Sequence, residues 1–431
     1  MKEKRILVIV NFFPPAGGGG VYRPLSFVKY LARFSWKVTV LTPKVGEFWI
    51  SDPGLEDQIP NDVKVVRTLS ISPSRFLNAV RKKNGKARPK RSTGSFELLR
   101  RLGEIFFIPD TYVGWAPFAY RAASKLCRKE DFDVILSTSP PDSTHLAAGK
   151  ISRKYRIPWI VDFRDPWISL YLRNPITSVH RKLHQMMERY TVEAERILVT
   201  TDWQRRKLIE LYPGCSVEKI PNGYEEEDFA GLEDVKPDPG KFTILHAGML
   251  TLERKSENFL KGVSLFLNRT EKAKGLLRII FAGGRESANE QWVSKLGLEN
   301  IVVFKNNLPH RECVRLEKSS HVLLLIKHDD RRYNGLIPGK LYEYIGAARP
   351  ILAVVPDGEA KNIVQDLDRG ETAQVNDPED IAGKIEILFD LYKTRKLDSS
   401  YSLEDVPKYS RRSEAERLNN LLSEVVYKDE Q

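Results

Sequence analysis

Residues 6–41 read ILVIVNFFPPAGGGGVYRPLSFVKYLARFSWKVTVL, and this stretch decides the fold. Its first apolar run, Ile6–Val10, has the length of a buried strand, and a glycine-rich loop at residues 11–20 follows it. Apolar residues then recur at helical spacing over Val21–Phe34, before a second short strand pattern at Lys37–Leu41. The stretch therefore predicts two parallel strands joined by a helix, the βαβ unit.

The same alternation of strand and helix patterns continues along the chain. Further strand-length runs occur at Val63–Arg67, Val134–Leu136, Trp159–Val161, Ile197–Thr200, Phe242–His246, Arg278–Phe281, Ile301–Phe304, Val322–Ile326 and Ile351–Val355. Helical patterns occur at Ala116–Arg128, Ser143–Tyr155 and Trp203–Tyr212, among other places. This order predicts an α/β protein with two doubly wound, Rossmann-like domains.

A polar linker indicates where the two domains divide. The first domain is predicted over residues 1–224, and the acidic, proline-containing linker at 225–240 follows it. The second domain is predicted over residues 241–405, and a last helix within 406–431 is predicted to pack back towards the first domain. Two such domains facing each other form a cleft, and ligands of open α/β sheets bind outside the carboxyl ends of the strands.

The composition excludes several classes of protein. The 431 residues are 41% hydrophobic and 29% charged, as in globular proteins and unlike disordered chains. The three cysteines, Cys127, Cys215 and Cys313, lie too far apart for a disulfide framework or a zinc cluster, which favours a reducing compartment. No apolar run reaches the roughly 18 residues of a membrane-spanning helix, and the first run breaks too early, at Asn11, for a secretory signal.

The positive charge is concentrated in the first half of the chain. Residues 1–220 carry 38 Lys and Arg against 21 Asp and Glu, whereas the whole chain has a net charge of +12. Ten of these cations lie between Arg75 and Arg101, within a predicted basic insertion at about 72–112. Such a surface suits anionic lipid, nucleic acid or a phosphorylated substrate, although the composition also fits a solvated loop between Arg81 and Ser95.

The first glycine-rich loop is a candidate ligand site. Gly17–Gly20 let the backbone approach a ligand closely, but the spacing is neither that of a dinucleotide-binding loop nor that of a Walker A loop. The second strand pattern also ends without the acid that binds a dinucleotide ribose, so a nicotinamide or flavin enzyme is disfavoured. A tight turn without a ligand is the alternative.

Two further loops of the first domain carry polar side chains at predicted strand ends. His145 follows the SPPDST sequence of residues 139–144 and is placed to donate a hydrogen bond to a sugar hydroxyl. Alternatively, Asp142, Ser143 or Thr144 caps the helix, and His145 is an ordinary surface residue. Arg164 and Asp165 are either acceptor-side residues or an ion pair that fixes a loop.

The second domain carries two candidate phosphate sites. Gly248 ends a strand pattern and precedes the basic pair Arg254 and Lys255, which suits a diphosphate. In a later stretch, Gly339 lies at a predicted helix start, and Glu343 is placed one turn further in to accept hydrogen bonds from ribose hydroxyls. A buried glutamate without a ligand would need another partner there.

Together these motifs resemble the retaining glycosyltransferases of the GT-B fold, in the family-4-like (group 1) type that builds bacterial surface polysaccharides. The resemblance covers essentially the whole chain. It is carried by residues 14–20 (PPAGGGG), 139–145 (SPPDSTH), 162–167 (DFRDPW), 221–224 (PNGY) with Phe229, Gly248 with Arg254, 338–344 (PGKLYEY) and 349–350 (RP).

The resemblance implies roles for particular residues. Arg254 and Lys255 would bind the donor diphosphate, Glu343 the ribose, and the backbone at Gly339, Lys340 and Leu341 the distal phosphate. Gly18 and Gly19 would approach from the acceptor side, and His145 would touch the transferred sugar. Asn307, in the loop after the strand Ile301–Phe304, would meet the base.

One position departs from the family pattern. The family has a second glutamate eight residues before Glu343, where this chain has Gly335. That glutamate usually holds sugar hydroxyls, so the resemblance leaves donor-sugar recognition open. Four neighbouring residues are the candidates to replace it, namely Asp329, Asp330, Tyr333 and Asn334.

The predicted function is thus a hexosyltransferase-like enzyme with a UDP- or GDP-linked sugar as substrate and neither cofactor nor metal. Its partners would be a saccharide or polyprenyl-linked acceptor and an anionic membrane. The enzyme would be cytoplasmic and peripheral, at the inner face of the cytoplasmic membrane. Two alternatives remain: a nucleotide-sugar epimerase or hydrolase, and a non-enzymatic lipid- or nucleic-acid-binding protein with a vestigial cleft. Nucleic acid is disfavoured because aromatic residues do not interleave the cations between Arg81 and Arg91.

Overall fold

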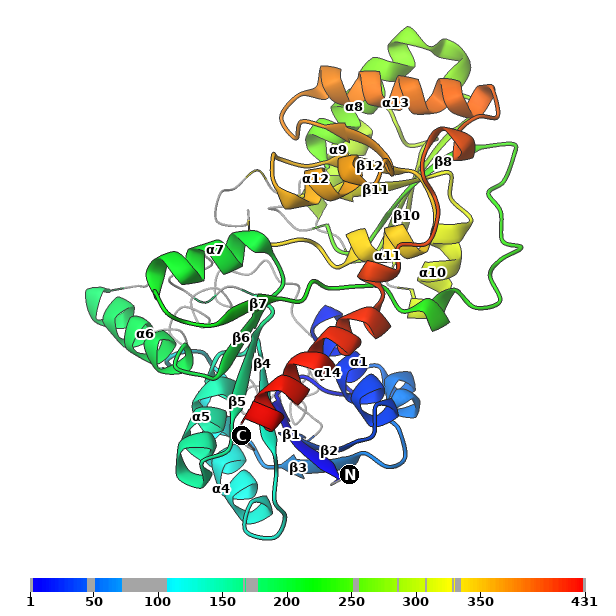
Figure 1. Ribbon diagram of the computed structural model, residues 1–431. Helices are drawn as coiled ribbons and strands as arrows, with labels where there is room; N and C mark the ends of the chain where they lie inside the picture. Colours follow the sequence, from blue (N-terminus) through cyan, green and yellow to red (C-terminus); the bar gives the residue numbers. More distant parts are fainter. Residues whose placement is uncertain are drawn as a thin grey trace, which may run out of the picture. The chain divides into compact units, whose positions relative to one another are not determined.

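The computed structural model describes residues 3–44, 51–71, 107–165, 167, 177–250, 256–284, 287–306, 308–327, 329 and 335–428. It divides into two compact units (Figure 1), with Met1–Pro221 and Arg412–Gln431 in unit 1 and Asn222–Arg411 in unit 2. Of the predicted basic insertion, residues 72–106 lie outside the described residues.

Unit 1 is built on a sheet of seven parallel strands in the order β3-β2-β1-β4-β5-β6-β7. The strands are β1 (Lys4–Val10), β2 (Trp36–Pro43), β3 (Lys64–Thr68), β4 (Val134–Ser139), β5 (Trp159–Phe163), β6 (Arg196–Val199) and β7 (Val217–Lys219). The helices are α1 (Gly19–Arg33), α4 (Ala116–Leu126), α5 (Ser143–Tyr155), α6 (Ser178–Thr191), α7 (Asp202–Leu211) and α14 (Arg411–Lys428), with short 3-10 helices at Pro53–Gln58 and Val113–Trp115.

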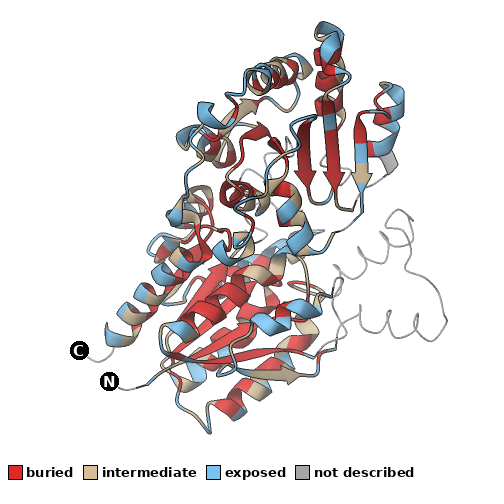
Figure 2. Cartoon of the chain, turned by 90° about the vertical axis from the view of Figure 1, so that its right-hand side faces the viewer, coloured by how far each residue is buried: buried red, intermediate tan, exposed pale blue. Residues whose placement is uncertain are grey.

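Both faces of this sheet are covered. Strand side chains alternate between faces, so Ile6 and Val8 of β1 join the apolar cluster that contains α1 and α14, whereas Leu7 and Ile9 join the cluster that contains α4 and α5. Burial of both faces explains why β1 is apolar throughout, and the strands are accordingly coloured as buried in Figure 2.

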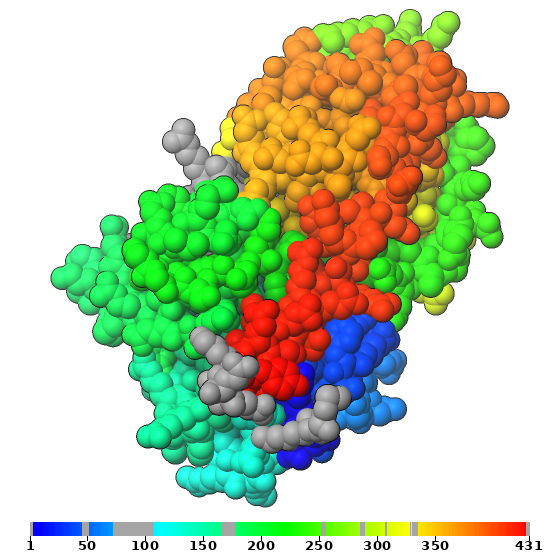
Figure 3. Space-filling view, viewed as in Figure 1, coloured from blue at the N-terminus to red at the C-terminus, as the bar shows by residue number. Residues whose placement is uncertain are grey.

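The helix at the end of the chain belongs to the core of unit 1. Ala415, Leu418 and Leu422 of α14 are fully buried in the same cluster as Ile6 of β1. Figure 3 shows this C-terminal helix beside the N-terminal segment of the chain. The chain therefore leaves unit 1 after Pro221 and returns to it at Arg412.

Unit 2 repeats the same architecture with six parallel strands, in the order β10-β9-β8-β11-β12-β13. The strands are β8 (Phe242–Ala247), β9 (Leu277–Ala282), β10 (Val302–Lys305), β11 (Val322–Ile326), β12 (Ile351–Val354) and β13 (Gly370–Ala373). The helices are α8 (Glu257–Arg269), α9 (Ser287–Lys295), α10 (His310–Lys318), α11 (Lys340–Gly346), α12 (Glu359–Asp366) and α13 (Pro378–Lys393), with 3-10 helices at Glu226–Phe229, Glu271–Ala273, Asp398–Ser400 and Pro407–Tyr409.

The predicted α/β class with two doubly wound sheets is confirmed, and each strand run identified in the sequence overlaps an observed strand. Two strands were missed, β7 and β13. Both lie at a sheet edge, span only three and four residues, and carry polar residues, so they lack the apolar run that marks a central strand. In the part of the chain that the structure describes, no helix is long and apolar enough to cross a membrane.

Candidate functional site

Each sheet has a switch point, where the strand order reverses between two central parallel strands. In unit 1 it lies between β1 and β4, and in unit 2 between β8 and β11. Loops from the carboxyl ends of such strands diverge to opposite faces, which leaves a crevice that binds ligands in doubly wound folds. The predicted site residues that the structure describes lie in loops or helix starts near these strand ends.

The glycine-rich loop of unit 1 leads directly into α1. Gly18 precedes the helix with a φ of 90°, a conformation that L side chains rarely adopt. Gly19 is exposed, and a Cβ added there would meet nothing within 4 Å. A Cβ at Gly20 would lie 3.0 Å from Nη1 of Arg164. The loop thus needs glycine for its backbone at Gly18 and for the close approach of Arg164 at Gly20.

Arg164 and Asp165 form the ion pair that the sequence left open. Nη2 of Arg164 donates to a carboxylate oxygen of Asp165 at 3.2 Å, and Nη1 donates to the carbonyl oxygen of Gly19 at 3.3 Å. Arg164 therefore fixes the glycine-rich loop. A direct acceptor-side role for either residue stays a prediction.

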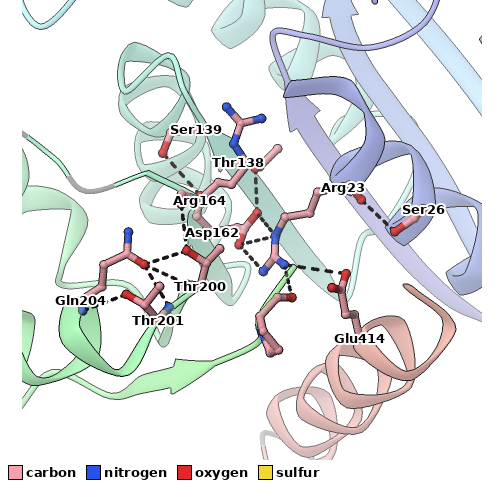
Figure 4. A network of polar contacts seen from close by, with 11 residues as sticks. Arg23, Ser26, Thr138, Ser139, Asp162, Arg164, Thr200, Thr201, Gln204 and Glu414 are labelled. Carbon is pink, nitrogen blue, oxygen red and sulfur yellow. Dashed lines mark hydrogen bonds and ion pairs between the residues drawn. The ribbon is translucent and has the colours of Figure 1, made fainter. Parts of the chain in front are cut away.

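A buried ion pair joins the central strands of unit 1 to the start of α1 (Figure 4). Arg23 donates from Nη2 to Asp162 at 2.9 Å and from Nη1 to the carbonyl oxygen of Pro221 at 2.9 Å, and both charged side chains are almost fully buried. Asp162 also accepts from the hydroxyl of Thr138, and Glu414 lies 3.9 Å from Nη1 of Arg23. The sequence analysis assigned no role to Arg23.

His145 is completely buried in the first turn of α5. Its Nδ1 lies 2.8 Å from Oγ of Ser137, which also accepts a hydrogen bond from Nε1 of Trp159. Trp159 can only donate to this hydroxyl, and in the described part of the chain Nδ1 is the contact that can accept the proton of Ser137. With the hydroxyl donating to Nδ1, the imidazole proton lies on Nε2. Within the described residues, Nε2 has no hydrogen-bond partner.

The surroundings of His145 keep it neutral. Burial lowers its pKa to about 3, against a smaller opposing effect of the Asp162 charge. The ring packs edge-on against Phe163 and stacks beside Trp167. His145 is thus a neutral donor rather than a surface histidine, and its contact with a transferred sugar stays a prediction.

The helix that carries His145 is capped from another loop. Asp110 accepts from the backbone N–H and from the hydroxyl of Ser143, each at 2.8 Å. Asp142, which occupies the cap position, makes no side-chain cap. The alternative that residues 142–144 themselves cap the helix is therefore wrong, because the carboxylate of Asp110 fills that place.

In unit 2 the two central strands separate at the switch point. The pairing of β8 with β11 covers only Ile244 with Val322 and Leu245 with Leu323. Beyond it, side chains bridge the gap: the hydroxyl of Tyr344 accepts from the N–H of Ala247 and donates to the carbonyl oxygen of Leu324.

His246 bridges the same gap. Its Nδ1 lies 2.9 Å from the carbonyl oxygen of Leu324, and its Nε2 lies 3.1 Å from Nζ of Lys340. A carbonyl only accepts and an ammonium only donates, so the imidazole carries its proton on Nδ1 and accepts from Lys340 on Nε2. No sequence motif pointed to His246, although a polar residue at the end of an apolar strand is a signal for such a position.

Lys340 lies over the predicted glycine at the end of β8. Gly248 has a φ of 121°, and a Cβ there would be 2.7 Å from Nζ of Lys340. Gly283, with a φ of 141°, packs so closely that its Cβ would be 2.5 Å from the carbonyl oxygen of Gly248. The loops after β8 and β9 therefore approach each other through glycines, and Lys340 covers the first of them.

Glu343 of α11 lies near two titratable side chains of α10, the carboxyl group of Glu317 and the thiol of Cys313. Burial raises the pKa of Glu317 well above its usual value, and the charge of Glu343 raises it further while Lys340 lowers it. Burial and the carboxylates of Glu317 and Glu343 also raise the pKa of Cys313, whose thiol donates to Glu317. Burial thus favours the protonated form of Glu317, and the charge of Lys340 opposes this effect.

A histidine and an aspartate join α10 to the start of unit 2. Nε2 of His310 lies 2.8 Å from the carboxylate of Asp228. Burial lowers the pKa of His310, but the hydrogen bond and charge of Asp228, together with Glu343, outweigh burial and raise it. The imidazole consequently stays protonated to a higher pH than a free histidine.

Several predicted residues lie outside the described residues, namely Arg254, Lys255, Asn307, Asp330, Tyr333 and Asn334. Gly339 is exposed and Leu341 is buried, whereas Gly335, at the position of the family's other glutamate, is buried. Asp329 accepts from the side chain of Asn376. Among the described residues, no group of three or more His, Cys, Asp or Glu side chains is arranged to hold a metal ion.

The first half of the chain matches a known family, and solved structures match nearly the whole chain. Residues 17–223 match the family model described as Glycosyl transferase 4-like domain. No curated protein matches the chain by sequence.

Solved structures match over nearly the whole chain. HepE of Anabaena in complex with UDP is 13% identical with a TM-score of 0.63, over 97% of this chain and 99% of that one. Sucrose-phosphate synthase of Thermosynechococcus elongatus is 13% identical with a TM-score of 0.64, over 98% and 99%. Trehalose 6-phosphate synthase of Burkholderia multivorans is 10% identical with a TM-score of 0.66, over 99% and 98%. At these identities the likeness shows the fold, which is GT-B.

Proposed function

We propose that this chain is a retaining glycosyltransferase that moves a sugar from a nucleoside-diphosphate donor to a saccharide or lipid-linked acceptor. The observation that carries the proposal is the switch point of unit 2. There Lys340 and Glu343 belong to the same short helix, next to two glycines that let the strand-end loops approach closely. A cation, a carboxylate and accessible backbone are the groups that bind a phosphate and a ribose. The match of residues 17–223 to a glycosyltransferase domain supports the proposal from the other unit.

In the proposed mechanism unit 2 holds the donor. Glu343 accepts hydrogen bonds from the ribose, the backbone at Gly339 and Leu341 meets the distal phosphate, and Arg254 and Lys255 stabilise the charge that grows on the leaving diphosphate. Asn307, which follows β10 in the sequence, is the residue proposed to contact the base. No metal takes part, so these cations supply the charge stabilisation.

Unit 1 contributes the acceptor side. The neutral His145 presents an N–H on Nε2, and this donor meets a hydroxyl of the transferred sugar. A buried donor without a partner costs about 1–3 kcal/mol, which a ligand hydroxyl would recover. Gly18 and Gly19 allow the loop before α1 to approach the same sugar or its phosphate. Transfer then proceeds on one face of the sugar with retention, and the leaving phosphate takes the acceptor proton.

The biological setting follows from the acceptor. A polyprenyl-linked or saccharide acceptor in surface polysaccharide synthesis places the enzyme at the inner face of the cytoplasmic membrane. The net charge of +17 over residues 1–220 favours an anionic membrane surface. HepE of Anabaena has been crystallised with UDP-glucose, which makes a UDP-linked sugar the first donor to test.

Calorimetric titration with UDP, GDP and ADP in EDTA tests the proposal. We expect saturable binding of one of the three, lost in Glu343→Ala and kept in Glu299→Ala, which removes an exposed carboxylate from the turn before β10. Product analysis with the matching nucleotide sugar then separates transfer from epimerisation or hydrolysis. Absence of binding by all three nucleotides, or unchanged binding in Glu343→Ala, would contradict the proposed donor site.

A further inference from the structure

The position of Lys340 is set by a residue that lies 94 positions earlier in the chain, His246. His246 is completely buried on β8, and Lys340 is the first residue of α11. The lysine ammonium is thereby held at the point where β8 and β11 separate, which is the place where a doubly wound sheet binds its ligand.

A glycine lies directly beside the ammonium of Lys340. Any side chain at Gly248 would put its Cβ 2.7 Å from Nζ of Lys340, so the glycine is required for the lysine to lie there. Gly283 supports the arrangement, since its own lack of a side chain lets the next loop pack on the carbonyl group of Gly248. One positive-φ glycine and a buried histidine thus contact Lys340, and a second positive-φ glycine packs on the first.

The chemistry of the contact favours an anionic ligand. The imidazole is a neutral acceptor, which orients the ammonium without cancelling its charge. An ammonium at a strand-end crevice forms its strongest hydrogen bonds with an anion, because a bond between two charged groups is stronger than one between neutral groups. Burial raises the pKa of the neighbouring Glu317 carboxyl group well above its usual value, which weakens its competition for the ammonium.

We propose that the side chain of Lys340 binds the diphosphate of the nucleotide donor, and that His246 is a positioning residue that holds the lysine for it. This inference rests on the proposed function and deepens it, because the resemblance gave Lys340 only a backbone contact and gave His246 no role. It makes Lys340 a phosphate ligand in addition to the basic pair at 254 and 255.

Variants of the full chain test the lysine. For the nucleoside diphosphate that the wild type binds, we expect Lys340→Met to weaken binding by about tenfold or more, the equivalent of at least 1.4 kcal/mol. Binding of the matching nucleoside, which lacks phosphate, should change less than about twofold by NMR titration. The control Lys274→Met removes an exposed cation from the turn before β9, and we expect it to alter neither affinity.

A double-variant cycle tests the histidine. His246→Phe removes the acceptor for Lys340, while the carbonyl group of Leu324 keeps the hydroxyl of Tyr344, so the strand gap stays bridged. We expect a loss of diphosphate affinity of about three- to tenfold, and no further loss when His246→Phe is added to Lys340→Met. A histidine with a purely structural role would weaken binding equally in both backgrounds.

The outcomes separate this inference from the function on which it rests. Wild-type affinity in Lys340→Met, equal losses for nucleoside and diphosphate, or an additive His246→Phe would each overturn the inference while the donor site stands. If the wild type binds none of UDP, GDP and ADP, the proposed function and this inference fall together.

Discussion

The two switch points share a topology and differ in how the central strands end. In unit 1, β1 and β4 stay paired from Ile6 with Val134 to Val10 with Thr138. In unit 2, β8 and β11 separate after two paired positions, and side chains of His246 and Tyr344 bridge the gap. The backbone pairing of the two central strands continues towards their carboxyl ends in unit 1 and stops early in unit 2.

The charges follow the same division. Arg23 and Asp162 of unit 1 are buried and satisfy each other, so this pair stabilises the fold. At the switch point of unit 2 the bridging side chains are a neutral imidazole, His246, and a phenol, Tyr344, and the cation Lys340 contacts the imidazole. Two units with the same fold thus differ in where their charged side chains lie. The cation of unit 2 would suit an anionic donor, and the neutral His145 of unit 1 would suit an uncharged sugar.

The largest expected effect comes from breaking the buried pair. Arg23→Met leaves Asp162 charged and buried, and loss of one partner of such a pair costs about 3–5 kcal/mol. Urea denaturation followed by tryptophan fluorescence reports mainly on unit 1, since six of the seven tryptophans lie there. The control is Lys64→Met, which breaks the exposed pair with Glu130. We expect it to lower the free energy of unfolding by less than about 1 kcal/mol. Equal losses of unfolding free energy in Arg23→Met and Lys64→Met would contradict the proposed difference between the units.

The next largest effect is a dependence of the stability of unit 1 on pH. The pKa of His145 is about 3 in the folded chain and near 6.5 when unfolded, so the unfolded state binds more protons between these values. Its contribution to stability is therefore complete above about pH 6.5 and falls by about 1.4 kcal/mol per pH unit below it. We expect the free energy of unfolding of the wild type to decline more steeply from pH 6.5 to 4.5 than that of His145→Gln. Parallel curves would mean that His145 titrates normally.

A smaller effect is expected from the open sheet of unit 2. Tyr344→Phe removes the acceptor for the buried N–H of Ala247, which costs about 1–3 kcal/mol. The single tryptophan of unit 2, Trp292, serves as the reporter once the other tryptophans are replaced by phenylalanine in a background that still folds. Tyr392→Phe, whose hydroxyl donates to the carbonyl oxygen of Pro239 at an exposed site, is the matched control. If Tyr344→Phe lowered the free energy of unfolding no more than Tyr392→Phe, the hydroxyl of Tyr344 would not be needed to bridge β8 and β11.

The smallest effect concerns the pair of His310 and Asp228. The folded pKa of His310 is raised, so the stability that it contributes is complete below the unfolded value near 6.5 and is lost as the pH rises through the folded pKa. Asp228→Asn should therefore destabilise unit 2 by up to about 1 kcal/mol at pH 5.5 and by less at pH 8.5. Hydrogen exchange of α10 at the two pH values measures this, and a loss that grows with pH would contradict it.

Local sequence patterns predicted most of the fold. Apolar runs such as Ile6–Val10 marked the central strands because both sheet faces are buried. The short edge strands β7 and β13 were missed since burial on one side demands little apolar sequence. The last helix, expected within 406–431, is α14 at Arg411–Lys428, and its apolar residues belong to the core of unit 1.

The candidate site was predicted less completely. Sequence patterns placed Gly248 after a strand and Lys340 and Glu343 in the first turn of a helix, where the structure has them, and their roles in binding stay predictions. The partners of these residues were not readable, since they depend on tertiary contacts: Asp110 caps a helix 33 residues further on, and Lys340 meets a histidine 94 residues away. A buried histidine such as His145 also looks the same in sequence as an exposed one.

The central claim is that the nucleotide binds at the open switch point of unit 2. The most direct test is a titration of the full chain, labelled with 15N-histidine, with UDP, GDP and ADP, after assignment through His246→Phe and His145→Gln. We expect one nucleotide to move the ring signals of His246 saturably, because Lys340 exchanges part of its contact with the imidazole for phosphate, while the signals of His145 stay in place. Saturable binding that moves His145 and leaves His246 unchanged would contradict the account.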